Sequence, residues 1–541
     1  MSRPFYASFV AGEPAARDFL ALDFRERSAR ENSARRAANR TIHPAVLAEL
    51  RVQNAAFPES AARCRHLETL AQPGAAVVIT GQQTGLFLGP LYTFYKAATA
   101  VAAARALGEE SGVPCVPIFW LQTEDHDFEE IAACHDLGAD GAPCCQRVAA
   151  DPEATARTSV AHRRLGPEVN AALAGLEEAL GGLPHAAAVL ARLRAHYRPG
   201  VGLGAAFAGV LAELFAREGL LVFNPRVAAV AKAAAPLYRR AIDDAATIGE
   251  HLSTRAQALR AAGLAVQIPT RQNCALVFVH EGGPAGPRFR LEKTDGQPGW
   301  TLAGRGTRVS DEELALCLDE TPLRLSTSAL LRPLVQDTLF PTAAYVGGPA
   351  ELGYFAQLGP LYDHFGLSQP LVVLRARFRC VDEKAQRLLG KLGLCAADFE
   401  GGESALERKL ANAPGSDALL PPDLLASEVD AALGPLLTRL ERTVVGVDPT
   451  LARPAERTRA QVRASLERLL AKYSRALARQ DETRWHRIEH LRTLLAPEGK
   501  PQERHYGWAS FAARAGEERF RDAVLAALAS PFTTDIKELC P

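Results

Sequence analysis

The sequence has no surplus of charge, because 62 lysines and arginines balance 62 aspartates and glutamates in 541 residues. A general nucleic-acid binder needs excess positive charge to displace the counterions of phosphates, so this kind of partner is disfavoured. Long blocks of like charge are also missing, and 48% of the residues are hydrophobic, which argues against a disordered chain. Length and composition therefore indicate a folded protein of several domain-sized parts.

Disulfide frameworks and membrane spans are absent as well. The 10 cysteines are scattered and form no CxxC pair, which is typical of reduced thiols in the cytosol. No run reaches the ~18–20 clean apolar residues of a membrane span. Glu13, Arg17 and Asp18 interrupt the N-terminus before the core of a signal peptide could form. We therefore expect a cytoplasmic protein that has neither membrane nor nucleic acid as a partner.

One region has the pattern of a βαβ unit. Residues 75–80 (AAVVIT) form a short apolar run rich in β-branched residues, which predicts a buried strand. A helix is expected from Pro90 to Gly108, and residues 116–121 (VPIFWL) predict a second buried strand. This order indicates a parallel sheet.

The remaining strand signals extend this sheet and add a smaller one. Further strands of the core are expected at 342–346 and 371–374, and 220–223 is a strand-like segment among helices. A small antiparallel insertion is expected from segments at 265–268, 275–279 and 289–291. The fold class is thus α/β with a doubly wound parallel sheet. The predicted parts are 1–160 (helices and first half of the core), 161–325 (helices and insertion), 326–385 (second half of the core), 386–500 (helical arm) and 501–541 (return to the core).

The arm has the spacing of paired helices. Apolar residues recur every three or four positions with charges between them, as in an antiparallel hairpin or coiled coil. Pro449 and Pro454 mark the turn. The stripe either caps the core or joins two copies of the chain. Its members are Val429, Leu433, Leu436, Leu440, Val462, Leu466, Leu469, Tyr473, Ile488, Leu491 and Leu495.

Two loops that follow predicted strands carry candidate site residues. Gly81-Gln82-Gln83-Thr84-Gly85 lets the backbone turn sharply beside a ligand. This loop matches neither GxGxxG nor GxxxxGK[ST], and a purely structural turn would also explain its glycines. The second loop, TEDHDFEE, contains Asp125, His126 and Asp127, a histidine between carboxylates that suits acid–base chemistry. A solvated acidic loop that caps a helix is the alternative.

A third loop is expected at the same edge of the sheet. Gly347 and Gly348 follow the strand at 342–346, and Glu351 either faces a ligand or complements the helix dipole. Lys96 and Arg332 are candidate cations for an anionic substrate. GxSxG, HExxH and CxxC are absent, and one histidine among carboxylates is not a zinc-like set, so no metal is predicted. The residues alone indicate a small-molecule site.

Three segments together resemble the BshC family of bacillithiol biosynthesis. They are VVITGQQTGLFLGPLYTFYKA, PIFWLQTEDHDFEEI and LLRPLVQDTLFPTAAYVGGPAELGYFAQL. The length and the order of the parts are similar over essentially the whole chain. The resemblance implies a Rossmann-like core similar to that of class I aminoacyl-tRNA synthetases, with inserted connective segments, a C-terminal coiled coil and a homodimer.

The resemblance also implies an activity, a ligase that joins the carboxyl of cysteine to the amine of glucosaminyl malate, the last step of bacillithiol synthesis. Synthetases of this type activate a carboxylate with ATP through an HxGH signature and a KMSKS-like loop, and this sequence has neither. Gln82 and Gln83 stand where the imidazoles are expected, and neutral amides stabilise transferring phosphates less well. An adenine nucleotide is a possible cofactor that the sequence leaves open.

The working hypothesis assigns each candidate a role. The two glycine loops (residues 81–85 and 347–348) cradle a carboxylate or phosphate, His126 with Asp125 and Asp127 transfers protons, and Arg332 or Lys96 holds the malyl carboxylates. Two alternatives remain, a metal-dependent hydrolase or transferase that uses residues 124–127, and a non-catalytic nucleotide-binding scaffold with a coiled coil.

Overall fold

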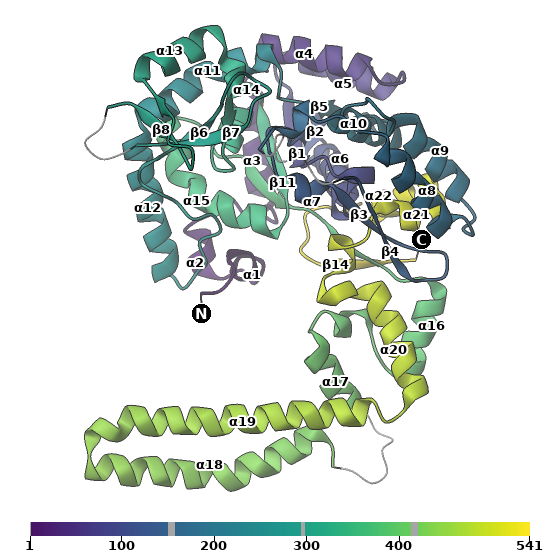
Figure 1. Ribbon diagram of the computed structural model, residues 1–541, viewed down its shortest axis with the longest axis vertical. Coiled ribbons are helices and arrows are strands. Elements are labelled where there is room, and N and C mark those ends of the chain that lie inside the picture. Colours follow the sequence, from purple (N-terminus) through teal and green to yellow (C-terminus); the bar gives the residue numbers. More distant parts are fainter. Residues whose placement is uncertain (1, 150–156, 294–297, 413–419, 541) are drawn as a thin grey trace. The chain divides into compact units, whose positions relative to one another are not determined.

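The computed structural model describes residues 2–149, 157–293, 298–412 and 420–540. The chain forms two compact units, residues 1–378 with 503–539 and residues 379–502. The first unit contains an α/β core, and the second consists mainly of helices (Figure 1). The predicted fold class is therefore confirmed.

A parallel five-stranded sheet forms the core of the first unit, in the order β12-β11-β1-β2-β5. The central strand β1 (Ala76–Gln82) pairs with β11 (Thr342–Gly347) on one side and with β2 (Cys115–Leu121) on the other. The edge strands are β12 (Leu371–Leu374) and β5 (Leu221–Phe223). The strands are buried almost throughout, as expected when helices cover both faces of a parallel sheet.

The strand order creates a crevice between β1 and β11. From β1 the chain builds the sheet outward through β2 to β5, and then returns to place β11 and β12 on the opposite side of β1. The loops that follow β1 and β11 therefore leave the sheet in opposite directions. Open α/β sheets bind ligands at such a switch point, outside the carboxyl ends of the strands.

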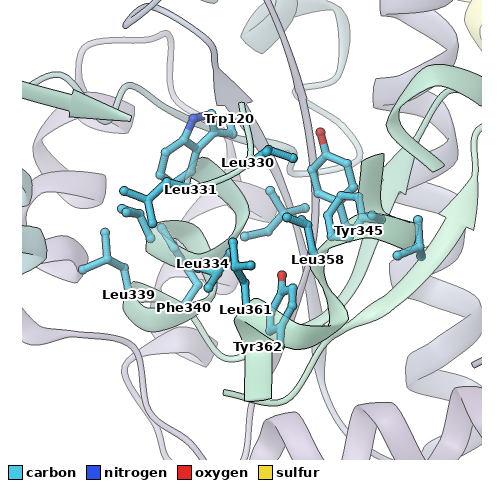
Figure 2. Close-up of a cluster of buried hydrophobic side chains, with 14 of the residues drawn as sticks. Trp120, Leu330, Leu331, Leu334, Leu339, Phe340, Tyr345, Leu358, Leu361 and Tyr362 are labelled. Carbon is cyan, nitrogen blue, oxygen red and sulfur yellow. The ribbon is translucent and has the colours of Figure 1, made fainter. Parts of the chain in front are cut away.

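Helices cover the sheet and complete its core. Helix α3 (Arg27–Ala38) and helix α6 (Tyr92–Ser111) pack against each other and against the central strands, while α15 (Pro349–Phe365) packs on β11 and β12. Figure 2 shows apolar side chains from strands and helices that meet in one cluster. They include Trp120, Leu330, Leu331, Leu334, Leu339, Phe340, Tyr345, Leu358, Leu361 and Tyr362.

Helix α6 ends one turn later than the sequence predicts. Gly108 lies inside the helix, and the left-handed residue that ends it is Gly112 (φ 73°), whose N–H donates to the Gly108 carbonyl. A side chain at position 108 would approach the Val113 carbonyl oxygen to 3.5 Å. Gly108 thus lies where the chain after the helix passes close to it, and the left-handed residue that ends the helix is Gly112.

The predicted antiparallel insertion is present as a second five-stranded sheet, in the order β10-β6-β7-β8-β9. Its strands are β6 (Cys274–His280), β7 (Arg288–Glu292), β8 (Trp300–Leu302), β9 (Arg308–Val309) and β10 (Leu325–Thr327). The strand predicted at 265–268 is wrong. The Ala265 N–H donates to the Arg3 carbonyl (2.8 Å), and the side chain of Gln357 binds both the N–H and the carbonyl of Ile268 (2.9 Å each), so these residues pair outside the antiparallel sheet.

The other elements of the first unit surround these two sheets. A small hairpin is formed by β3 (Ala133–Leu137) and β4 (Pro143–Arg147). The other helices are α1 (Phe5–Val10), α2 (Pro14–Arg17), α4 (Pro44–Ala55), α5 (Ala61–Leu70), α7 (Phe128–Ile131), α8 (Glu168–Leu180), α9 (Ala186–His196), α10 (Leu203–Leu214), α11 (Ala228–Asp243), α12 (Ala245–Ala261), α13 (Asp311–Glu320), α14 (Arg332–Leu339), α21 (Trp508–Ala515) and α22 (Glu517–Ala527).

The second unit contains the predicted antiparallel hairpin of long helices, α18 (Pro422–Val447) and α19 (Ala452–Ala478). A short 3-10 turn, Pro449–Leu451, joins them, so Pro449 lies at the turn as expected. The hairpin leaves part of its apolar stripe exposed to solvent. The other helices of this unit are α16 (Glu383–Leu392), α17 (Glu403–Ala411) and α20 (Glu482–Leu495).

Across the residues that the structure describes, we find no helix with the length and apolar character needed to span a bilayer.

Candidate functional site

A cavity of about 310 Å³ lies at the carboxyl ends of β1 and β11, at the switch point of the sheet. Its wall is formed by the ends of β1 and β11, by the segments that follow β1, β2, β11 and β12, and by residues near the starts of α6, α7, α14 and α15. Arg504 adds a side chain from the segment before α21. The three loops predicted to meet at one edge of the sheet therefore do so.

The loop after β1 presents two glutamines to the cavity. Gly81 is required here because a side chain would lie 3.0 Å from the Trp120 carbonyl oxygen on β2. The side chain of Gln82 donates to the Tyr92 hydroxyl (3.3 Å) and accepts from Lys96 (2.9 Å). Gln83 donates to Asp125 Oδ2 (2.8 Å), and its own Oε1 is buried without a hydrogen bond from any described residue.

A buried ion pair fixes the loop after β11 to helix α6. Lys96 Nζ lies 2.6 Å from Glu351 Oε2 and donates to the Gly81 carbonyl (2.8 Å). Glu351 also accepts from the Gly348 N–H (2.7 Å) and from the Tyr345 hydroxyl (2.5 Å). Burial alone would raise the pKa of Glu351, but Lys96 and these hydrogen bonds bring it below its ordinary value. Both charges are thus already neutralised.

Two further arginines differ in how they are paired. Arg375 is neutralised, because both of its terminal nitrogens bind the Glu503 carboxylate (2.7 and 2.9 Å). Arg332 is buried, donates to the Gln336 side chain and the Tyr354 hydroxyl (2.9 Å each), and forms no ion pair with a described carboxylate. Arg332 therefore keeps an uncompensated positive charge, which suits an anion.

The opposite part of the wall is acidic and contains Asp125 and Glu130. Asp125 accepts from Gln83, from the His126 N–H (2.7 Å) and from Arg288 (3.4 Å). Burial alone would raise the pKa of Asp125, but the hydrogen bonds from His126 and the charge of Arg288 bring it well below its ordinary value. Burial and the charges of Asp127 and Asp125 raise the pKa of Glu130.

The structure brings together many of the residues predicted from the sequence. Gly81, Gln82, Gln83, Lys96, Asp125, Arg332, Gly348 and Glu351 all line the cavity. Five others, Thr84, Gly85, His126, Asp127 and Gly347, do not.

Two residues of the predicted catalytic set lie behind the wall. His126 Nδ1 is 3.4 Å from both Asp125 Oδ1 and an Arg288 nitrogen. Asp127 caps helix α7 by accepting from the Glu130 N–H (3.3 Å). A direct proton transfer by His126 thus stays a prediction, and its position indicates that it orients Asp125.

Sequence reasoning missed several lining residues. Arg375 directly follows the strand at 371–374, so the rule applied to the other strand ends would have found it. Tyr92, Glu130 and Tyr354 lie within segments that were singled out, but nothing in their spacing marks them. Arg504 comes from a segment remote in sequence, and no local signal could have placed it at the cavity.

No group of three or more histidine, cysteine, aspartate or glutamate side chains is arranged to hold a metal ion within the described ranges. Two carboxylates of the cavity wall, Asp125 and Glu351, are instead bound by an amide, a hydroxyl and cations of the protein.

The fold and the cavity define an α/β protein with a Rossmann-like core, a cavity at the switch point of its sheet and a helical arm. Residues 1–376 match the family model described as the BshC N-terminal Rossmann-like domain of bacillithiol biosynthesis, and residues 378–535 match the BshC C-terminal coiled-coil domain. The chain therefore belongs to the BshC family.

Curated relatives cover most of the chain. A protein of Salinibacter ruber is 37% identical over 504 residues, which is 92% of this chain and 89% of the relative. A protein of Solibacter usitatus is 33% identical over 480 residues, 87% of this chain and 85% of the relative. Both carry the name "Putative cysteine ligase BshC".

Proposed function

We propose that this protein is a cytoplasmic cysteine ligase that joins the carboxyl of L-cysteine to the amine of glucosaminyl malate, the last step of bacillithiol synthesis. Membership of the BshC family and the names of its relatives support this activity. The observation that carries the proposal is a cavity at the switch point that is basic at Arg332 and Arg504 and acidic at Asp125 and Glu130.

Glucosaminyl malate matches this distribution of charge. Its malyl part carries two carboxylates, and its sugar carries an amine. Arg332 is preorganised for a carboxylate, because Gln336 and Tyr354 hold its guanidinium and the ring of Tyr345 stacks on it at 4.9 Å. Arg504 is exposed at the same cavity and supplies a second cation. The acidic part of the wall is complementary to the ammonium form of the amine.

Asp125, His126 and Asp127 contribute to this site in different ways. Asp125 lines the cavity and is held by three donors, among them the N–H of His126. Asp127 caps the short helix that carries Glu130. His126 and Asp127 thus position the two carboxylates that face the substrate.

An adenine nucleotide fits this cavity poorly. Three carboxylates line it, namely Asp125, Glu130 and Glu351. Of its four cations, Lys96 and Arg375 are already paired with Glu351 and Glu503. A triphosphate needs uncompensated cations or positive dipoles around it. The cavity therefore suits glucosaminyl malate, the acceptor of the cysteinyl group. The group that activates cysteine is not assigned to this cavity.

The helical arm is proposed to join two copies of the chain. Leu436, Leu440 and Leu469 of the hairpin are 50–63% exposed, although they belong to its apolar stripe. Exposed leucines that repeat at helical spacing are typical of a coiled-coil surface that packs against a partner.

The activity is tested by mass spectrometry of products formed by the purified protein. The protein is incubated with cysteine and glucosaminyl malate, with and without ATP and magnesium, and a tube without cysteine is the control. We expect the mass of bacillithiol only where cysteine is present, and the ATP pair reports whether the nucleotide is consumed. No product in either tube from folded protein contradicts the proposed function.

A further inference from the structure

Of the three carboxylates in the cavity wall, only Glu130 forms no ion pair with a described cation. Glu351 is neutralised by Lys96 at 2.6 Å. Asp125 faces the buried guanidinium of Arg288 at 3.4 Å and accepts two further hydrogen bonds. A carboxylate held by several donors is a weak base, because these donors stabilise its ionised form. Neither Glu351 nor Asp125 is therefore suited to take up a proton.

Glu130 has the opposite surroundings. Its side chain reaches solvent at the cavity, and the negative charges of Asp127 and Asp125 act on it more strongly than the positive charge of Lys96. Partial burial of its carboxylate and the charges of Asp127 and Asp125 raise the pKa of Glu130, although Gln83 and Lys96 act in the opposite direction, and a raised pKa makes it a better proton acceptor. Contact with solvent also gives an accepted proton a path to water.

A second observation indicates that a ligand with a hydrogen-bond donor, such as an ammonium group, binds in the same place. Gln83 lines the cavity and is 9% exposed, and its Oε1 receives no hydrogen bond from any described residue. Its Nε2 is used by Asp125 (2.8 Å), which fixes the orientation of the amide. A buried acceptor without a donor is costly, so a ligand N–H is expected to satisfy it.

We propose that Glu130 and Gln83 Oε1 bind the ammonium group of the acceptor, and that Glu130 takes up the proton this nitrogen must lose before its lone pair can form the amide bond. This inference rests on the proposed function and names the base of the reaction.

The step is balanced. The acyl donor is a mixed anhydride of the cysteine carboxyl with a phosphate group. The bound ammonium first gives one proton to Glu130, which passes it to water, and this frees the nitrogen lone pair. The lone pair then forms the C–N bond, the phosphate leaves with the electron pair of its C–O bond, and the second proton that the nitrogen loses leaves with the phosphate.

The neighbouring residue offers a matched control. Glu129 is exposed, forms an ion pair with Arg147 and does not line the cavity. E129Q removes the same charge from the same helix, α7, as E130Q does. Any effect of net charge or of helix stability should therefore appear in both variants, whereas loss of the ammonium site should appear only in E130Q.

Binding is measured first by calorimetry with two ligands, glucosaminyl malate and its N-acetyl derivative, which lacks the ammonium. E130Q should weaken binding of glucosaminyl malate about tenfold and leave the N-acetyl derivative unchanged. E129Q should change neither. Equal effects of E130Q on both ligands, or none, overturn the proposal for Glu130. Wild-type protein that binds neither ligand instead contradicts the proposed function.

Measurements of turnover distinguish a catalytic base from a residue that only binds the substrate. E130A should lower kcat about 100-fold, and added acetate should restore part of this loss by replacing the missing carboxylate. E130D should retain more activity than E130A, and E129Q should match the wild type. An E130A variant with wild-type kcat, or with a raised KM alone, overturns the role of Glu130 as base.

Discussion

At the scale of single residues, Asp136 on β3 is a carboxyl group buried outside the candidate site. It is fully buried and accepts from the Ser510 hydroxyl (2.7 Å), the Ser510 N–H (3.2 Å) and the Cys134 thiol (3.4 Å). Burial raises the pKa of Asp136 to about 6, even though these donors lower it. The folded protein therefore keeps this proton at a pH where the unfolded chain has lost it.

This carboxyl should make stability depend on pH. Because the folded state binds more protons between the two pKa values, the free energy of unfolding falls as pH rises from about 4 to about 6 and levels off above. Between pH 5 and pH 7 the expected loss is about 1 kcal/mol. D136N keeps an oxygen acceptor for Ser510 and should remove this slope. Urea unfolding of both proteins across this range is the measurement, and equal slopes would contradict the assignment.

Most candidate site residues could be predicted because they follow strands of a parallel sheet. Gln82 ends β1 and Gln83 follows it, while Gly348 and Glu351 lie within four residues of the end of β11, and this position alone places them at one edge. Their roles could not be predicted in the same way. Lys96 is bound to Glu351, a residue far along the chain, so its charge is not available as the sequence suggested.

At the scale of elements, the loop after β1 depends on two glycines in close contact. A side chain on Gly85 would lie 3.0 Å from Gly89 Cα and 3.3 Å from its nitrogen, both backbone atoms. Between them, Phe87 (φ 50°) and Leu88 (φ 73°) adopt left-handed conformations and are fully buried. Phe87 and Leu88 disfavour this backbone conformation, so the packing of their buried side chains must hold the turn in it.

G85A should therefore destabilise the protein by about 1–3 kcal/mol, since backbone atoms cannot move aside as a flexible side chain can. G390A is the control. Gly390 lies inside α16 with no atom within 4 Å of the added carbon, so alanine there should be neutral or stabilising by about 0.5–1 kcal/mol. Scanning calorimetry compares the two. A thermal midpoint that G85A leaves unchanged would show that the loop can relax.

The strands of the core could be predicted because burial on both faces makes them continuous apolar runs bounded by turns. The segment at 265–268 is also mostly apolar, but the side chain of Gln357 binds the backbone groups of Ile268. An apolar sequence pattern indicates that a segment is buried, but it does not show which group pairs with the backbone of that segment. This is why the element was mistaken while its neighbours at 275–279 and 289–291 were correct.

At the scale of the whole molecule, the second unit buries only part of its apolar stripe. Val429, Leu433 and Leu466 line a groove within the hairpin, whereas Leu436 and Leu440 on α18 are 50% and 53% exposed. Ion pairs of Arg459 with Glu441 and of Arg463 with Asp430 join the two helices but add little stability at the surface. Self-association would remove these leucines from water.

The oligomeric state should therefore depend on this stripe. Burying a leucine contributes roughly 1.5–3 kcal/mol, and each substitution acts twice in a symmetric pair. L436Q/L440Q should consequently weaken dimerisation at least about 100-fold. Val52, on the first unit and 67% exposed, provides the control V52Q, which removes an exposed apolar side chain without touching the hairpin. Sedimentation velocity over a range of concentrations measures the dissociation constants. A wild type that stays monomeric, or a double variant that dimerises as the wild type does, would mean that the exposed leucines have another role.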